Sequence, residues 1–134
     1  MIGIVVVTHA GLADALIEAA ELIIGPLEGV SAVCIDRDMD INDAKEELGK
    51  AVASVGQGGA GVLILTDLFG GTPTNLSVEL LQSGDVEILT GVNLPMLIKG
   101  VGARSQQDLD GLASLLKEYA GSAIMRPSEL LRSS

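Results

Sequence analysis

The sequence is poor in aromatic and basic residues. Its 134 residues include one phenylalanine, one tyrosine and no tryptophan, so the core of the fold must be aliphatic. Eight lysines and arginines stand against eighteen aspartates and glutamates, for a formal net charge of −10. Because contacts to nucleic-acid phosphates need clustered basic residues, and these are scattered, we expect no nucleic-acid binding. The acidic surface fits either simple solubility or a basic partner.

Cysteine and histidine occur once each. A lone Cys34 excludes a disulfide within the chain and favours a reducing compartment. Since it lies in an apolar run, we expect it to be a core residue, not a nucleophile. One histidine and one cysteine on separate segments predict no metal site, and no cofactor is expected. The sequence also has no Walker A loop, no GxGxxG after the first strand and no GxSxG elbow.

No long hydrophobic run is present. The apolar stretch 2–8 is too short to span a bilayer, and no basic segment precedes it as in a signal peptide. We therefore expect a cytoplasmic protein. The length is typical of one domain, and without linkers or repeats we expect residues 1–134 to form a single, stand-alone domain.

Short apolar runs alternate with segments of helical periodicity. The runs, which are typical of strands buried on both faces, are Ile2–Thr8, Val30–Ile35, Val62–Thr66 and Val86–Thr90. Helices are expected over Gly11–Ile24, over Asn42–Val55 and Pro73–Gln82, in a short segment after Asn93, and after an N-cap at Ser105. The first of these places Leu12, Leu16, Ala20 and Ile23 at helical spacing. Ala123–Arg126 is a candidate last strand, and residues 129–134 are expected to be loosely held.

This alternation predicts an α/β fold built from right-handed βαβ units, a doubly wound, mainly parallel four-stranded sheet with helices on both faces. Ligand sites in such sheets lie at the carboxyl ends of the strands, where the strand order reverses. Three segments that follow strands are therefore candidates for a ligand site: Thr8–Gly11, Asp67–Pro73 and Gly91–Pro95.

A strand order of 2-1-3-4 would place His9 beside Asp67, because adjacent strands lie about 4.8 Å apart. A carboxylate that accepts the Nδ1–H of an imidazole fixes its tautomer and leaves Nε2 as a nucleophile. It also stabilises positive charge on the ring during attack. The alternative is an exposed histidine with a capping aspartate, and the choice depends on the assumed strand order.

The Gly70-Gly71-Thr72-Pro73 loop is a second candidate element. Glycines let the backbone approach a ligand, Thr72 suits an N-cap and Pro73 suits a first helical turn. Free amides at a helix start favour an anion such as phosphate. Such loops are also ordinary structural joints, and both interpretations stay open on this loop alone.

Taken together, these segments resemble the enzyme IIA component of the mannose family of the bacterial phosphoenolpyruvate-dependent sugar phosphotransferase system. The resemblance covers almost the whole chain. It is carried by Ile4–Ala10, the helix 12–25, Thr66–Asn75 and Gly91–Leu97, and it departs from the family at Ala10, where glycine or serine is frequent.

The resemblance implies a phosphotransferase with a phosphohistidine intermediate. His9 would be the acceptor, Asp67 the orienting carboxylate, and Gly70, Gly71 and Thr72 the phosphate-binding loop. The phosphocarrier protein HPr would be the donor and a IIB component the next acceptor, at the periphery of a membrane IIC/IID permease. It also implies the strand order 2-1-3-4, frequently with an added antiparallel strand, and a homodimer.

Two other functions fit the same residues. The main alternative to phosphoryl transfer is a regulatory binding module switched by phosphorylation of His9. The chain would also fit the phosphoryl donor subunit of a dihydroxyacetone kinase, which resembles the same family. Neighbouring genes for membrane components or for a kinase would separate these alternatives.

Overall fold

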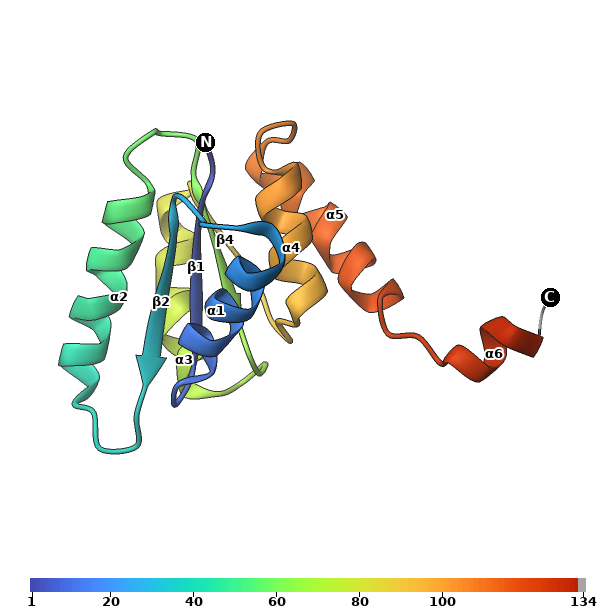
Figure 1. Cartoon of the computed structure of the whole chain (residues 1–134). Helices are drawn as coiled ribbons and strands as arrows, with labels where there is room; N and C mark the ends of the chain where they lie inside the picture. Colours follow the sequence, from blue (N-terminus) through green and yellow to red (C-terminus); the bar gives the residue numbers. More distant parts are fainter. Residues whose placement is uncertain (133–134) are drawn as a thin grey trace.

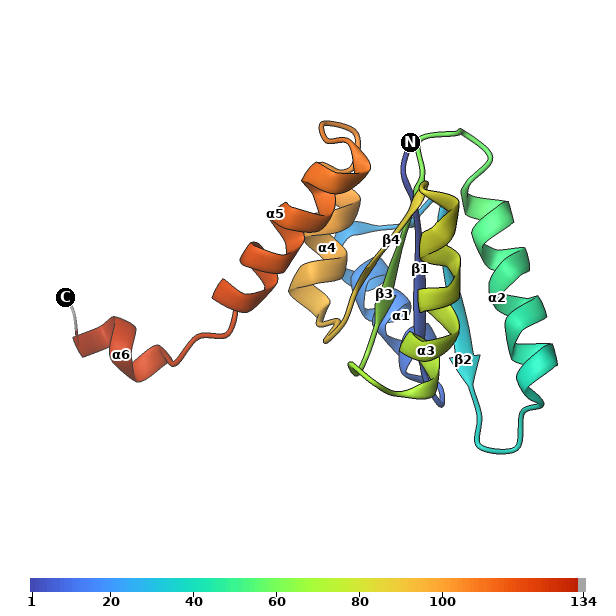
Figure 2. The same cartoon turned by 180° about the vertical axis from the view of Figure 1, so that it is seen from behind.

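A parallel four-stranded sheet forms the centre of the molecule (Figures 1 and 2). A computed structural model describes residues 1–132. The strand order is β2-β1-β3-β4, as expected. The strands are β1 (Gly3–His9), β2 (Val30–Ile35), β3 (Val62–Thr66) and β4 (Val86–Leu89).

Helices cover both faces of the sheet. One face packs against α1 (Leu12–Ile24), α4 (Leu94–Ala103) and α5 (Leu109–Ser122), and the other against α2 (Ile41–Val55) and α3 (Thr72–Val78). A 3₁₀ turn, η1 (Glu79–Ser83), follows α3, and α6 (Pro127–Arg132) ends the described chain.

The sheet separates two hydrophobic cores, and successive side chains of the central strands point alternately into one and the other. In β1, Ile4 and Val6 pack with the α1/α4/α5 core, while Val5 and Val7 pack with the α2/α3 core, and all four are fully buried. Strands buried on both faces carry mostly apolar side chains, which is why β1 and β3 stand out in the sequence as apolar runs that end in a threonine or histidine. The predicted aliphatic core is confirmed.

Several helix boundaries differ from those expected. The α5 cap is Asp108, whose carboxylate accepts the Gly111 N–H at 2.8 Å, and not Ser105. The expected helix 73–82 is α3 followed by η1. Helix α1 buries Ala13 and the expected Ala20, and the expected Leu16 packs against the same core, but Leu12 is 44% and Ile23 60% exposed.

The C-terminal residues do not add a strand. Helix α5 runs to Ser122, residues 124–126 are irregular, and α6 projects away from the body of the molecule (Figures 1 and 2). A strand at 123–126 would need a neighbouring sheet edge, and this segment leads away from one. The tail expected to be loose is helical to Arg132; its last residues, 133–134, lie outside the described part.

Arg104 ties the amino-terminal edge of the sheet together. Its buried guanidinium donates to the carbonyl oxygens of Ile2, just before β1, and of Glu28 and Gly29 in the α1–β2 loop. Charge-assisted hydrogen bonds of this kind offset the cost of burying the cation. No helix of residues 1–132 has the length and apolar character needed to cross a bilayer.

Candidate functional site

The register of β1 and β3 brings His9 and Asp67 together. The strands are parallel neighbours with Val7 paired to Thr66, so Asp67, the residue after β3, stands beside the end of β1. The carboxyl ends of both strands share one edge, as the topology predicted.

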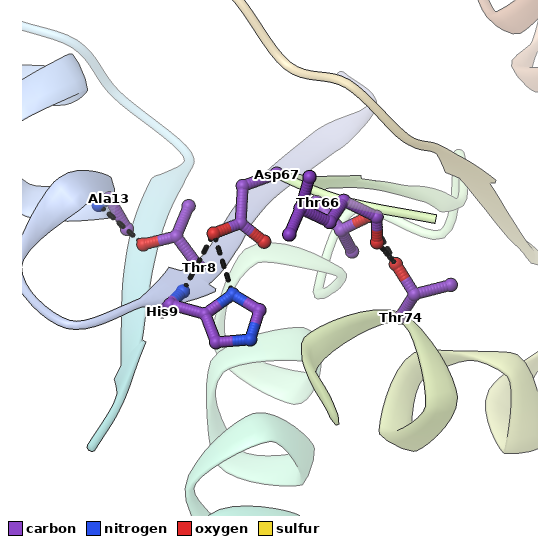
Figure 3. Close-up of polar contacts among 7 residues, drawn as sticks. Thr8, His9, Ala13, Thr66, Asp67 and Thr74 are labelled. Carbon is purple, nitrogen blue, oxygen red and sulfur yellow. Dashed lines mark hydrogen bonds and ion pairs between the residues drawn. The ribbon is translucent and has the colours of Figure 1, made fainter. Parts of the chain in front are cut away.

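One carboxylate oxygen holds both the backbone and the ring of His9. Oδ2 of Asp67 accepts the His9 backbone N–H at 2.9 Å and lies 2.9 Å from Nδ1 of the imidazole (Figure 3). The hydrogen bond from the backbone N–H fixes the position of the His9 main chain, and the contact with Nδ1 fixes the orientation of the imidazole. The Asp67 side chain is only 11% exposed, whereas that of His9 is 48% exposed. Because Nδ1 is occupied, Nε2 is the ring nitrogen left to react.

The electrostatics of the pair favour an ionised carboxylate. Burial raises the pKa of the Asp67 carboxyl, but the hydrogen bonds from His9 outweigh this effect. The pKa of Asp67 therefore lies below its ordinary value of 3.8, and the carboxylate is charged at neutral pH. A negative oxygen at Nδ1 stabilises the tautomer with hydrogen on Nδ1 and any positive charge that develops on the ring.

The backbone turns sharply directly after the histidine. Ala10 has φ +50°, the left-handed region that costs about 1–2 kcal/mol for a residue with a Cβ. Its amide donates to the Ile35 carbonyl at 2.9 Å, and Oγ1 of buried Thr8 accepts the Ala13 N–H at 2.7 Å. These bonds hold the strand-to-helix turn, and with it His9, in a strained but fixed shape.

Two threonines brace the loop after β3. The hydroxyls of buried Thr66 and Thr74 lie 2.6 Å apart, and the Thr74 hydroxyl also donates to the Leu68 carbonyl (Figure 3). The loop thereby closes onto the end of β3, directly before Asp67. The adjacent Leu68 and Phe69 side chains remain exposed, Phe69 by 87%.

The glycine loop lies against the imidazole. A Cβ on Gly71 would come within 2.8 Å of Cε1 and 3.3 Å of Nε2 of His9, so only glycine leaves room for the ring. Gly70 has φ +86° and turns the chain into α3. Thr72 is the first residue of α3 and not its cap, which is Gly71, while Pro73 lies in the first turn as expected.

A hollow of about 510 Å³ opens beside His9. It extends from the histidine toward the β2–α2 loop and the start of α2. Its lining residues are His9, Ala10, Ile35, Asp36, Arg37, Met39, Ile41, Ala44 and Thr72. The sequence did not single out residues 35–44 as part of a site. The available signal was position alone, since they too follow the carboxyl end of a strand next to β1.

The segment after β4 does not join this hollow. Asn93 caps α4 by accepting the Met96 N–H and donates to the Ala120 carbonyl, so its role is structural. Cys34 is half-buried and not fully in the core. Burial raises the pKa of its thiol, whose Sγ lies 3.5 Å from Oδ2 of Asp14. Residues 1–132 bring together no group of three His, Cys, Asp or Glu side chains able to hold a metal ion.

Known proteins share both the sequence and the fold. The family described as "PTS system fructose IIA component" matches residues 3–117. The chain is 30% identical over 119 residues to the PTS system mannose-specific EIIAB component of Escherichia coli K12, covering 87% of this chain and 36% of that protein. It therefore spans about a third of the length of that relative.

Two further matches cover more of the related protein. The sorbose-specific EIIA component of Lacticaseibacillus casei is 35% identical over 99 residues, which is 72% of this chain and 69% of that protein. The crystal structure of a phosphotransferase system component EIIA from Streptococcus agalactiae aligns with a TM-score of 0.87 and 32% identity, over 96% of this chain and 99% of that one. The chain belongs to the fructose/mannose IIA family of the sugar phosphotransferase system.

Gly71→Ala tests the close approach of the loop to His9. The backbone at Gly71 (φ −82°, ψ 170°) suits alanine, so the variant acts only through its Cβ. We expect the ring to turn away from Asp67 and the His9 ring signals in NMR spectra to shift. The free energy of unfolding should change by no more than about 1 kcal/mol, because the half-exposed ring can turn toward solvent without disturbing the core.

Gly11→Ala is the matched control. Gly11 also lies in a loop next to His9, but a Cβ there meets no atom within 4 Å. Unshifted ring signals in a folded Gly71→Ala protein would contradict the proposed packing of loop and imidazole.

Proposed function

We propose that this protein is a phosphoryl carrier that accepts a phosphoryl group on His9 from phosphorylated HPr and passes it to a IIB component. The observation that carries the proposal is the 2.9 Å contact between Nδ1 of His9 and Oδ2 of Asp67 at the carboxyl edge of the sheet. Membership of the IIA family supports the reaction class.

The proposed reaction uses Nε2 of His9, the ring nitrogen that does not contact Asp67. The lone pair of His9 Nε2 attacks phosphorus in line, the phosphorus–nitrogen bond to the donor histidine breaks, and its electron pair stays on that nitrogen. The phosphorylated ring of His9 carries positive charge, which the Asp67 carboxylate stabilises through the Nδ1–H. Transfer onward reverses these roles, with a nucleophile of the IIB component attacking the same phosphorus. Catalysis consists mainly of positioning and electrostatics.

The loop after β3 is proposed to hold the phosphoryl oxygens. The first amides of a helix lack acceptors within it, and Gly71 places the start of α3 against the reacting side of the ring. Thr72 lines the same hollow as His9 and offers a hydroxyl. Gly70, Gly71 and Thr72 are thus the proposed phosphate-binding residues, and His9 and Asp67 the proposed catalytic ones.

The exposed surface around His9 suits transient protein partners. Leu68 and Phe69 present apolar side chains next to the reacting histidine, where HPr and the IIB component would bind in turn. We propose a cytoplasmic protein that works at the periphery of a IIC/IID permease. We also propose a homodimer, in which the projecting segment with exposed Ile124 and Met125 packs on a second copy.

Phosphorylation of His9 is the first expected outcome. Incubation with phosphoenolpyruvate, enzyme I and HPr should add one phosphoryl group, stable in alkali and labile in acid, because His9 is the only histidine. Intact-mass spectrometry and acid lability measure it. His9→Ala should take up none; a folded His9→Ala protein that is still labelled would end the proposal.

Asp67→Asn should slow transfer from phosphorylated HPr on the order of 10²-fold. The amide is nearly isosteric, so packing survives, but it removes the negative charge and can present its NH₂ to the ring. The measurement is the initial rate of transfer, with circular dichroism as the folding check.

Asp110→Asn, an exposed acidic residue in the first turn of α5, makes the same charge change far from the site. It should leave the rate unchanged. If Asp67→Asn matches this control, the carboxylate has no part in transfer.

A further inference from the structure

Most lysines and arginines of this acidic chain interact with carbonyl, aromatic or carboxylate groups of the same chain. Arg104 is buried on backbone carbonyls, and Lys99 lies 5.0 Å from the centre of the Tyr119 ring. Three more pair with carboxylates: Lys45 with Glu79, Lys50 with Glu46 and Arg126 with Glu129. Within residues 1–132, Arg37 forms no ion pair or hydrogen bond and is the cation that lines the hollow beside His9.

The sheet places Arg37 opposite Asp67 with respect to the histidine. Strand β1 lies between β2 and β3, and His9 pairs with Ile35, the last residue of β2. Arg37 follows two residues later at the same carboxyl edge. The imidazole thus has the largely buried Asp67 carboxylate on its β3 side and Arg37, an exposed residue of the same hollow, on its β2 side.

The charges that face Arg37 come from its own loop. Asp36 lines the same hollow and Asp38 follows Arg37 in sequence; both are exposed, and neither forms an ion pair with the guanidinium. Asp40 is occupied as the N-cap of α2, where it accepts the N–H groups of Asn42 and Asp43. Without Arg37, the hollow would present only negative formal charge to an incoming group.

In the proposed reaction, the phosphoryl group that the donor brings to His9 is an anion, and it must approach the carboxyl edge of the sheet. The chain has a net charge of −10, and Asp67 places one negative charge directly behind His9. A guanidinium presents a planar fork of N–H donors that matches two oxygens of a phosphoryl group, and such charge-assisted bonds are stronger than neutral ones.

We propose that Arg37 binds the phosphoryl group on His9, across the hollow, during transfer and in the phosphorylated protein. This rests on the proposed function and adds to it a binding residue from the β2–α2 loop. Arg37 forms no bond to phosphorus; it holds two of the oxygens while the phosphorus–nitrogen bond is exchanged.

Phosphorus NMR of the phosphorylated protein tests the contact directly. A guanidinium beside the phosphoryl group favours its more negative form, so Arg37→Gln should raise the midpoint of the phosphorus pH titration by about half a unit or more. Arg37→Lys keeps the charge and should stay closer to wild type. The control is Lys50→Gln, which removes the same charge from an exposed position on α2 and should leave the midpoint unchanged.

A small phosphoryl donor separates this role from protein docking. With phosphoramidate in place of HPr, Arg37→Gln should phosphorylate about tenfold more slowly than wild type, and Lys50→Gln at the wild-type rate. Because Arg37 is exposed, these variants should fold normally, which circular dichroism verifies.

The outcomes separate the two proposals. If wild type is phosphorylated on His9 while Arg37→Gln and Lys50→Gln share its midpoint and rate, the role of Arg37 is wrong and the carrier function stands. An effect of Arg37→Gln seen with HPr alone would also overturn it, since the arginine would then contact the donor protein. Wild-type protein that accepts no phosphoryl group from either donor would overturn both.

Discussion

The site depends on two hydrogen bonds that converge on a single oxygen atom. Oδ2 of Asp67 receives the backbone N–H and faces Nδ1 of the same residue, His9, both at 2.9 Å. One bond ties the end of β1 to the residue after β3, and the other orients the imidazole. A histidine at a strand end would otherwise rotate freely about its side-chain bonds, and no nitrogen would be selected for reaction.

The surrounding fold keeps this contact in place. β1 and β3 are buried on both faces and locked in parallel register, so their ends cannot slip without exposing a whole set of apolar side chains. The hydrogen bond between the Thr66 and Thr74 hydroxyls closes the loop that contains Asp67. The left-handed backbone of Ala10 is strained, and such strain persists only where the surrounding structure is rigid. Rigid elements thus position a half-exposed nucleophile, while the adjacent apolar Leu68 and Phe69 stay open to a partner.

The sequence predicted the sheet and the histidine–carboxylate pair because both follow from strong patterns. β1 and β3 are continuous apolar runs, and polar residues directly after them stand out. The adjacency of His9 and Asp67 needed the strand order, which periodicity alone does not determine and which the family resemblance implied. Once the structure gave that order, the contact followed from the register.

Features without a local pattern were missed. The hollow along Arg37 arises from the path of a loop in three dimensions, and no motif marks it. Ser105 and Asp108 are equally good caps by composition, and only packing selects the second. The apolar face of α1 is predicted only in part: Leu16 and Ala20 pack against the core as expected, whereas Leu12 and Ile23 are exposed. The last segment has the composition of a strand, but in the described chain it leads away from the sheet and pairs with neither edge strand.

The tautomer of His9 tests the account most directly. Long-range ¹H–¹⁵N correlation spectra at neutral pH report which ring nitrogen carries hydrogen, and the signals need no assignment because the chain has one histidine. The geometry predicts a protonated Nδ1 and an unprotonated Nε2 in the wild-type protein, and a loss of this preference in Asp67→Asn. A neutral ring with its hydrogen on Nε2 in the wild-type protein would contradict it, because the nitrogen assigned to accept the phosphoryl group would then lack its lone pair.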